Sequence, residues 1–316
     1  MAQYNTPILF LLFNRLDTTK QVFNAIRQIK PTRLYIACDG PRDGREGEKE
    51  KIEEIRKYVI SNIDWKCNVK TLFREKNLSC GPAVKQAIDW FFEHEEMGII
   101  FEDDTLPEES FFSYCEELLI RYQNDDRIGM ISGNNHVGFS LINDSYVFSK
   151  FKWTWGWATW RRAWKNMDFN LLCLESNYKD SIITNMGYDK NSYNHWKRNI
   201  DAINHQYVNT WDYHWFLSLS AQNQMCIFPR VNLVSNIGFG EDATHCVNDA
   251  PERYTRTGKL DFPLCHPQYI LPNYEFEKMY QQVMIPKPSG LKRFIPAKIK
   301  HLIKILLKNR NSYKRK

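Results

Sequence analysis

Three consecutive carboxylates follow a short apolar run and are the residues of this sequence best suited to chemistry. The run 97–101 leads directly into Glu102, Asp103 and Asp104. Adjacent acids repel one another, and they are costly where a strand leaves the core unless a metal, hydrogen bonds or water offset their charge. Hard oxygen ligands favour Mg²⁺ or Mn²⁺, which usually bind through one or two carboxylates and substrate phosphates. The pattern predicts a divalent-cation site; the alternative is an acidic loop, or a cap for the helix that begins near Pro107.

The elements that would position these acids alternate in type along the first 100 residues. Short apolar runs alternate with longer amphipathic segments, which predicts a parallel sheet with crossover helices on its faces. The expected strands cover residues 8–13, 33–37, 68–73 and 98–101, and the expected helices cover 18–29, 46–62 and 81–94. A helix over 110–124 and a strand over 128–132 should follow.

Polar residues follow three of these expected strands. Asn14 and Arg15 come after the first strand, Asp39 after the second, and the three acids after the fourth. In open sheets of this kind, ligands bind beyond the carboxyl ends of the strands. We therefore expect these side chains to meet at one crevice.

Composition narrows the class of protein. The chain has 316 residues, 43% of them hydrophobic, and its net charge of +6 is concentrated near the end, which does not favour nucleic-acid binding. Its eight cysteines include no C-x-x-C pair, which indicates reduced thiols in a cytosolic protein. We find no convincing signal peptide and no run long enough to span a bilayer.

The end of the chain differs from the rest. We expect one domain over residues 1–284, with a nucleotide-binding half to about 135 and an acceptor half beyond it, and a separate tail over 285–316. Residues 291–316 hold ten Lys or Arg among regularly spaced apolar residues. This pattern predicts a basic amphipathic helix, which would either bind an anionic membrane surface at the inner face of the plasma membrane or pack on its own domain.

Taken in order, these motifs resemble those of GT-A glycosyltransferases, specifically the N-acetylglucosaminyltransferase I group and its bacterial relatives. The motifs are the acids followed by a proline and an aromatic pair, a tryptophan-rich loop at 151–164, Trp211-Asp212, and Gly238-Phe-Gly240 with His245. The likeness covers about residues 5–270. It implies an α/β, Rossmann-like GT-A fold of the nucleotide-diphospho-sugar transferase type, with an open, mostly parallel sheet flanked by helices.

The resemblance also implies roles for individual residues. Asp104 would ligate Mn²⁺ or Mg²⁺, and Glu102 and Asp103 would orient the ribose and metal-bound water. Arg15 and Asp39 would contact the nucleotide. His245 would contact the metal or a phosphate, although a lone histidine is more often structural. The sequence departs from the family where Trp211 to Trp215 lacks a second acid, which puts the acceptor and the base in doubt.

Two further interpretations rest on residue chemistry. Asp212 between aromatic neighbours could act as a general base, with its pKa raised by partial desolvation, or it could cap a helix over 213–222. Trp155 and Trp157 could stack on a sugar ring, whereas tryptophan clusters are more often core.

Together these features predict an inverting, metal-dependent glycosyltransferase of bacterial surface polysaccharide synthesis. It would move a sugar from a UDP-sugar, such as UDP-GlcNAc, to a saccharide or lipid-linked glycan. One alternative is a sugar-phosphate nucleotidyltransferase, although that class usually has an N-terminal glycine-rich turn and residues 6–17 contain no glycine. Another is a noncatalytic carbohydrate-binding protein.

Overall fold

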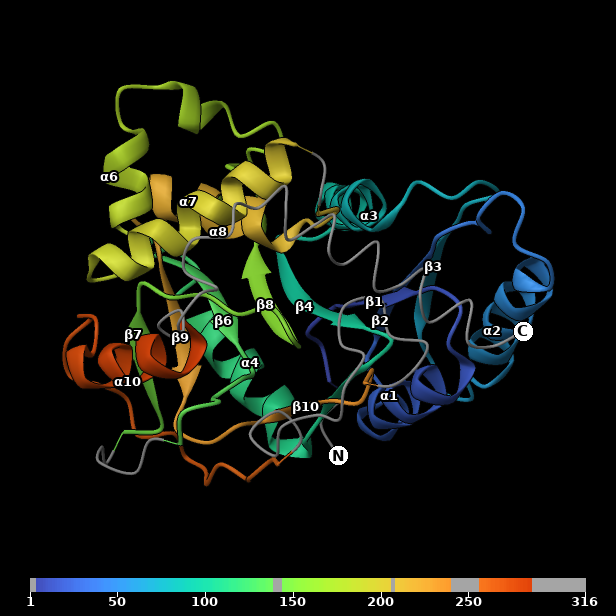
Figure 1. The fold of residues 1–316 in the computed structure, drawn as a ribbon. Coiled ribbons are helices and arrows are strands. Elements are labelled where there is room, and N and C mark those ends of the chain that lie inside the picture. The colour runs from blue at the N-terminus through green and yellow to red at the C-terminus, as the bar shows by residue number, and fades with distance from the viewer. Residues whose placement is uncertain (1–3, 139–143, 206–207, 240–255, 286–316) are drawn as a thin grey trace.

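The computed structural model is built around one large twisted sheet with helices on both faces (Figure 1). It describes residues 4–138, 144–205, 208–239 and 256–285. Within them, the strand order of the large sheet is β3-β2-β1-β4-β8-β6-β9-β7. Its strands are β1 (Ile8–Leu12), β2 (Arg33–Cys38), β3 (Asn68–Phe73), β4 (Met97–Glu102), β6 (Ile128–Ser132), β7 (Tyr146–Ser149), β8 (Trp157–Trp160) and β9 (Met225–Pro229).

The sheet is mostly parallel, as the sequence predicts. Strands β3, β2, β1 and β4 pair in parallel, and so do β6 and β9. Strand β8 runs antiparallel between β4 and β6, and β7 runs antiparallel to β9 at the edge. A second, two-stranded sheet pairs β5 (Thr105–Pro107) with β10 (Val234–Asn236).

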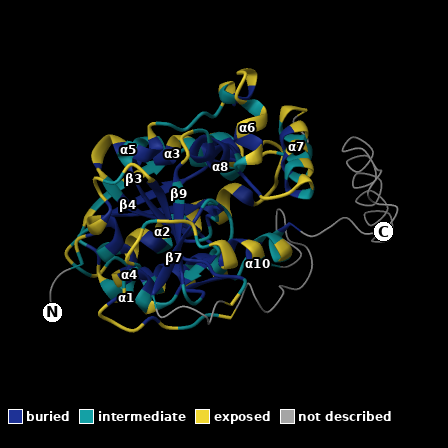
Figure 2. Cartoon of the chain, turned by 90° about the vertical axis from the view of Figure 1, so that its left-hand side faces the viewer, coloured by how far each residue is buried: buried dark blue, intermediate teal, exposed yellow. Residues whose placement is uncertain are grey.

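Helices cover both faces because alternate residues of the buried strands point to opposite sides. Leu9 and Leu11 of β1 belong to one core cluster, and Ile8, Phe10 and Leu12 to the other. Figure 2 shows buried residues along the sheet and exposed ones on the outer helix surfaces. The second cluster takes in α1 (Leu16–Ile29), α2 (Glu48–Ser61) and α4 (Glu109–Arg121). The first takes in α3 (Cys80–His94), α5 (Arg161–Trp164), α6 (Lys179–Thr184), α7 (Lys190–Asn204), α8 (Asp212–Ala221) and α10 (Tyr274–Met284), with the 3₁₀ helix η1 (Leu172–Glu175) beside them.

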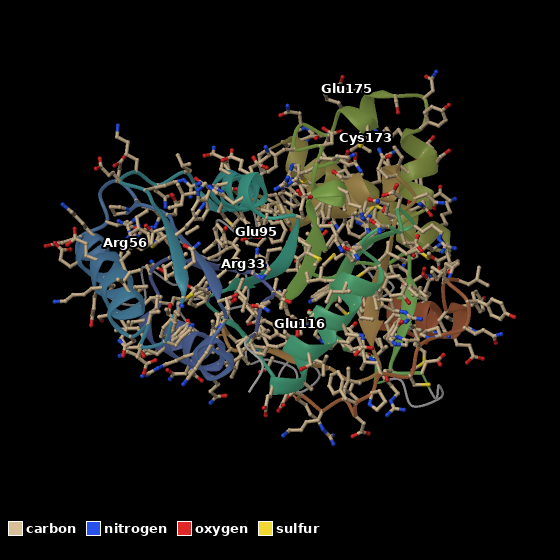
Figure 3. The ribbon with its side chains drawn as sticks, turned by 180° about the vertical axis from the view of Figure 1, so that it is seen from behind. Arg33, Arg56, Glu95, Glu116, Cys173 and Glu175 are labelled. Carbon is tan, nitrogen blue, oxygen red and sulfur yellow. The ribbon has the colours of Figure 1, made fainter. Side chains whose placement is uncertain are left out.

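A charged contact links the amino-terminal ends of the strands to a covering helix. Arg33 at the start of β2 forms an ion pair of 2.5 Å with Glu95, the residue after α3, and both are labelled in Figure 3. The hydroxyl of Tyr35 donates to the same carboxylate at 2.7 Å. These contacts lie at the edge of the sheet away from the acids, so they fix α3 without occupying the crevice.

The tryptophans of the loop before β8 divide between core and surface. Trp157 has no exposed surface, and its ring stacks on that of Trp211 with centroids 5.5 Å apart. Trp164 and Trp215 pack close by, 4.9 Å apart. Trp155 is only half-buried. Trp157 therefore joins β8 to α8 as a core residue, and we no longer count it among the sugar-stacking candidates.

Several expectations fall at the margins of the structure. The tail over 286–316 lies outside the described residues, so its membrane binding stays a prediction, as does the division into domains. In the described part of the chain, no helix is long and apolar enough to cross a bilayer. The seven cysteines placed there are free thiols.

Truncating the buried tryptophan should be much more destabilising than truncating its half-buried neighbour. Trp157→Ala should lower the free energy of unfolding by about 3–5 kcal/mol, because it removes a fully buried ring and leaves a cavity. Trp155→Ala is the matched control and should cost well under half as much. Urea denaturation followed by circular dichroism measures both, and equal losses would contradict this assignment of the core.

Candidate functional site

The ends of three neighbouring strands bring the predicted polar residues to one edge of the sheet. Strand β1 lies between β2 and β4 and is parallel to both, with Leu12 opposite Cys38 and Leu11 opposite Glu102. The residues that follow these strands therefore face the same side. Asn14 and Arg15, Asp39, and the acids after β4 are gathered here.

Arg15 supplies positive charge to the acidic end of β4. Its guanidinium lies 2.5 Å from Asp103 Oδ1 and 2.9 Å from Asp104 Oδ2. The backbone N–H of Phe13 donates to the other oxygen of Asp103 at 3.3 Å. Burial works against the charged guanidinium, but the two carboxylates outweigh it and raise the pKa of Arg15. Arg15 thus offsets part of the negative charge for which the sequence predicts a metal ion.

One arginine does not offset three carboxylates. Burial raises the pKa of Glu102 well above its ordinary value, and the charges of Asp104, Asp103 and Asp212 add to the rise. Burial also raises the pKa of Asp103 to about 6, against the opposing effect of Arg15. Because crowding disfavours the ionised forms, a divalent cation at this position would stabilise them.

The donor set suits a cation that is shared with a ligand. Across the described ranges, no three His, Cys, Asp or Glu side chains come together as a complete metal site. Mg²⁺ and Mn²⁺ do not need one, because they bind through one or two carboxylates with phosphate oxygens and water. Asp104 is the more accessible of the two aspartates, with 17% of its side chain exposed against 4% for Asp103. It is therefore the best candidate ligand, whereas His245 lies outside the described residues.

The segment 237–239 lies directly on the acids. Strand β10 pairs with β5 next to them, and the N–H of Ile237 donates to the carbonyl of Asp104 at 2.8 Å. A Cβ added to Gly238 would stand 2.1 Å from Asp104 Oδ2 and 2.6 Å from Arg15 Nη1. Phe239 meets Trp155 edge to face, 6.3 Å between ring centroids. Only glycine fits at position 238, because Asp104 and Arg15 already fill the space that a side chain would need.

Asp39 connects the end of β2 to the loop before α3. Its carboxylate accepts from the N–H of Leu78 at 3.0 and 3.1 Å and from that of Gly40 at 3.0 Å. Arg56 of α2, labelled in Figure 3, donates nearby to the carbonyls of Cys38, Asp39 and Arg74. Burial raises the pKa of Asp39, while its backbone donors act in the other direction. Contact with a nucleobase stays a prediction for this residue.

Asp212 is the first residue of α8 and does not occupy the cap position, which belongs to Trp211. Its carboxylate accepts from the Thr210 hydroxyl and from the N–H of Tyr213. The helix-cap alternative is therefore corrected, since the helix begins at Asp212 itself and its cap position is one residue earlier. Asp212 lies within electrostatic reach of the acids, because its charge contributes to the raised pKa of Glu102.

Cys80 lies within electrostatic reach of four of the acids, and the sequence analysis gave it no role. Desolvation by its surroundings raises the pKa of its thiol to about 12, although the residue is exposed, and four carboxylates add to the effect. These are Glu102, Asp212, Asp104 and Asp39. Cys80 begins α3, so the amino-terminal end of that helix lies in the midst of the acids. The signal in the sequence was only the short Asn77–Pro82 turn, which is weak on its own.

A cavity of about 620 Å³ opens beside the acids. It lies between the turn after β1, the loop that joins β2 to α2, and the segment 237–239. Its charged lining residues are Arg15, Asp17, Arg42, Arg45, Glu46, Glu48, Lys51 and Glu54. Most of these were not predicted, because the sequence 42–54 has the mixed charge of an ordinary exposed loop and helix.

No family model matches the sequence, and no curated protein does. The inositol-1-phosphate CTP transferase of T. maritima matches over 72% of this chain and 86% of its own, with 8% identity and a TM-score of 0.34. A cytidylyltransferase of Leptospira borgpetersenii matches over 51% and 63%, with 11% identity and a TM-score of 0.31. HddC of Yersinia pseudotuberculosis matches over 50% and 77%, with 12% identity and a TM-score of 0.29.

These matches contradict the predicted UDP-sugar glycosyltransferase. Two of the three structures are named as nucleotidyl-transferring enzymes and none as a glycosyltransferase, so that prediction is wrong on this comparison. The UDP-sugar donor and the lipid-linked acceptor lose their support with it. The fold class is confirmed by the sheet itself. The likeness is too distant to assign a role to any residue.

The fit of Gly238 against the acids gives a test of the cation site. Gly238→Ala should weaken Mn²⁺ binding by at least about tenfold, the usual effect of displacing groups that orient a metal ligand. Gly258→Ala is the control, because its added Cβ would meet only Val231, at 3.3 Å. Mn²⁺ titration followed by electron paramagnetic resonance gives both affinities. Equal affinities in the two variants would show that the packing on Asp104 does not control the site.

The raised pKa of Asp103 predicts how stability depends on pH without metal. The folded-state pKa is about 6 and the ordinary value is 3.8, so between these limits the folded chain binds more protons than the unfolded chain. The contribution of Asp103 is therefore greatest below about pH 4 and is lost as pH rises to about 6. In EDTA, Asp103→Asn should flatten the free energy of unfolding over this window, whereas the exposed Asp43→Asn should not. An unchanged slope in Asp103→Asn would exclude this titration.

Proposed function

We propose that this chain is a metal-dependent nucleotidyltransferase that transfers the nucleotidyl group of a nucleoside triphosphate to a sugar phosphate and releases pyrophosphate. The observation that carries the proposal is the acidic end of β4, bridged by Arg15, beside a cavity whose lining includes Arg42, Arg45 and Lys51. Binding of a nucleoside triphosphate needs both carboxylates that hold a cation and basic side chains that hold the phosphates. They stand here at the carboxyl edge of parallel strands, where such sheets bind nucleotides.

The reaction fits this charge distribution. An oxygen of the sugar phosphate attacks the α-phosphorus, the bond to the β-phosphate oxygen breaks, and its electron pair leaves with pyrophosphate. A divalent cation, when bound, stabilises the negative charge that develops on these oxygens. Asp104 would hold the cation with a neighbouring carboxylate. Arg15, released from its carboxylates, would turn to a phosphate.

The lack of glycine over residues 6–17 matters for this proposal. Nucleotidyltransferases usually bind triphosphate through backbone N–H groups of a glycine-rich turn. In this chain the corresponding turn offers Asn14 and Arg15, and the cavity adds the side chains of Arg42, Arg45 and Lys51. We therefore assign phosphate binding mainly to side chains, which makes it sensitive to salt.

The proposed reaction changes the role of Asp212. A phosphate monoester has a second pKa of about 6, so it is already ionised at neutral pH and needs no general base. We assign Asp212, whose charge acts on Glu102, to binding hydroxyl groups of the sugar phosphate. Trp155 beside Phe239 is the remaining candidate for stacking on the sugar.

Pyrophosphate release is the direct test. The wild-type chain with Mg²⁺ or Mn²⁺ should release pyrophosphate from one of ATP, CTP, GTP, TTP and UTP in a panel of sugar 1-phosphates. Asp104→Ala should reduce turnover by about 10²-fold or more, because it removes electrostatic support for the leaving group. The exposed acid variant Asp261→Asn is the control, because Asp261 is not among the residues that line the cavity, and it should keep wild-type activity.

The outcomes separate the proposal from its rivals. Absence of pyrophosphate with every triphosphate, together with release of nucleoside diphosphate from a sugar nucleotide, would overturn it. Binding of glycan without any nucleotide would favour a noncatalytic carbohydrate-binding protein instead.

Asp212 allows a separate kinetic test of the same proposal. Asp212→Asn should raise the KM for the sugar phosphate about tenfold and leave the KM for the triphosphate unchanged, because the lost charge contacts only the sugar. If turnover instead falls by about 10²-fold or more at unchanged KM, with a shifted pH profile, Asp212 is a general base.

A further inference from the structure

One wall of the cavity is a loop with no buried side chain of its own. Residues 42–47 are all exposed, and Gly44 and Gly47 adopt left-handed backbone conformations with φ of 71° and 74°. The loop carries Arg42 and Arg45 onto the cavity. A segment of this kind needs an anchor if its arginines are to hold a defined position.

Glu48, the first residue of α2, is that anchor. Only 6% of its side chain is exposed, although both neighbours along the chain are exposed. One oxygen accepts from the N–H of Arg42 at 2.7 Å, and both oxygens accept from the guanidinium of Arg42, at 3.0 and 3.1 Å from Nε. The amide of Asn14, after β1, donates to the same carboxylate at 2.9 Å.

These contacts join two sides of the cavity. Asn14 belongs to the turn after β1 and Arg42 to the loop after β2, so Glu48 holds both walls in one arrangement. The guanidinium of Arg42 also lies over the ring of Phe13, 5.2 Å from its centroid. Arg42 is thereby fixed on one side by an aromatic face and on another by a carboxylate.

The bonding also distinguishes Glu48 from the acids after β4. The Arg42 guanidinium, opposed by burial, lowers the pKa of Glu48, whereas the pKa values of Glu102 and Asp103 are raised. Glu48 is thus a satisfied ion-pair partner, and the acids after β4 are crowded.

We infer that Glu48 is a positioning residue for the nucleotide, which fixes Asn14 and Arg42 on the cavity wall so that their polar groups face the triphosphate. This inference rests on the proposed function and adds to it the residue that orders the phosphate-binding loop. It requires that Glu48 act through Arg42 and Asn14, without touching the nucleotide or the cation.

The test compares two acids of the same helix turn. Glu48→Gln removes the charge that holds Arg42, and Glu50→Gln removes an exposed charge two residues further along the first turn of α2. Glu48→Gln should raise the KM for the triphosphate about tenfold, with kcat and the KM for sugar phosphate within twofold of wild type. Glu50→Gln should leave all three constants unchanged.

A double-mutant cycle identifies the partner. Arg42→Gln should raise the KM for the triphosphate by itself, and adding Glu48→Gln to it should raise that KM little further, because both changes break the same contact. Independent, multiplying effects would show that Glu48 does not act through Arg42. Thermal unfolding of each variant accompanies the kinetics, so that the active fraction is known.

Failure of the inference is distinguishable from failure of the proposed function. If wild type releases pyrophosphate and Glu48→Gln keeps the wild-type KM, Glu48 is not a positioning residue and the function stands. If Glu48→Gln loses kcat in proportion to folded protein with no change in KM, its role is structural only and the inference is overturned. If wild type releases no pyrophosphate, the proposed function fails, and unchanged binding of a triphosphate to Glu48→Gln in calorimetry would overturn the inference too.

Discussion

The ion pairs between Arg15 and the aspartates after β4 are the interaction on which the rest of the site depends. Three carboxylates at a strand end would destabilise the fold. Arg15, which follows β1, forms ion pairs with two of them at the end of the neighbouring strand β4. The pairing works because the two strands are adjacent and parallel, so the residues that follow them emerge side by side. The compensation is incomplete, as the raised pKa values of Glu102 and Asp103 show. What remains is a site with an excess of negative charge that a divalent cation can take up.

The surrounding elements are arranged around this charge. The segment after β10 presses a glycine against Asp104 and Arg15, and the amino-terminal end of α3 lies among the acids. On the far side, Glu48 holds Arg42 and Asn14 on the wall of the cavity. Acids therefore stand at the centre, and the flank carries Arg42, Arg45 and Lys51 together with acids such as Glu48. This order suits a ligand with several phosphates, because its charge can be shared between a cation and arginines.

The sequence was sufficient for the first half of the fold and for the centre of the site. Apolar runs such as 8–12 and 128–132 are buried on both faces, so their strands could be recognised from hydrophobicity alone. The meeting of Arg15 with the acids also followed from parallel pairing.

Strands β7, β8 and β9 were missed because their placement depends on long-range partners. The sequence predicts an aromatic loop over residues 151–164. Within it, Trp157–Trp160 form β8, which is held between β4 and β6. The sequence does not predict a role for Glu48, for a related reason. In sequence it is one acid among many, and it is distinguished only by its contacts with Arg42 and Asn14. The motifs that resemble those of glycosyltransferases, although they occur in the same order, were not sufficient to predict the reaction.

The most direct measurement is anomalous diffraction from crystals soaked in Mn²⁺ with a nonhydrolysable nucleoside triphosphate. The account predicts a manganese peak at about 2.1 Å from a carboxylate oxygen of Asp104, with Arg15 turned away from Asp104 and the triphosphate extending toward Arg42. Manganese bound elsewhere, with Arg15 still bridging the two aspartates and no nucleotide in the cavity, would contradict it.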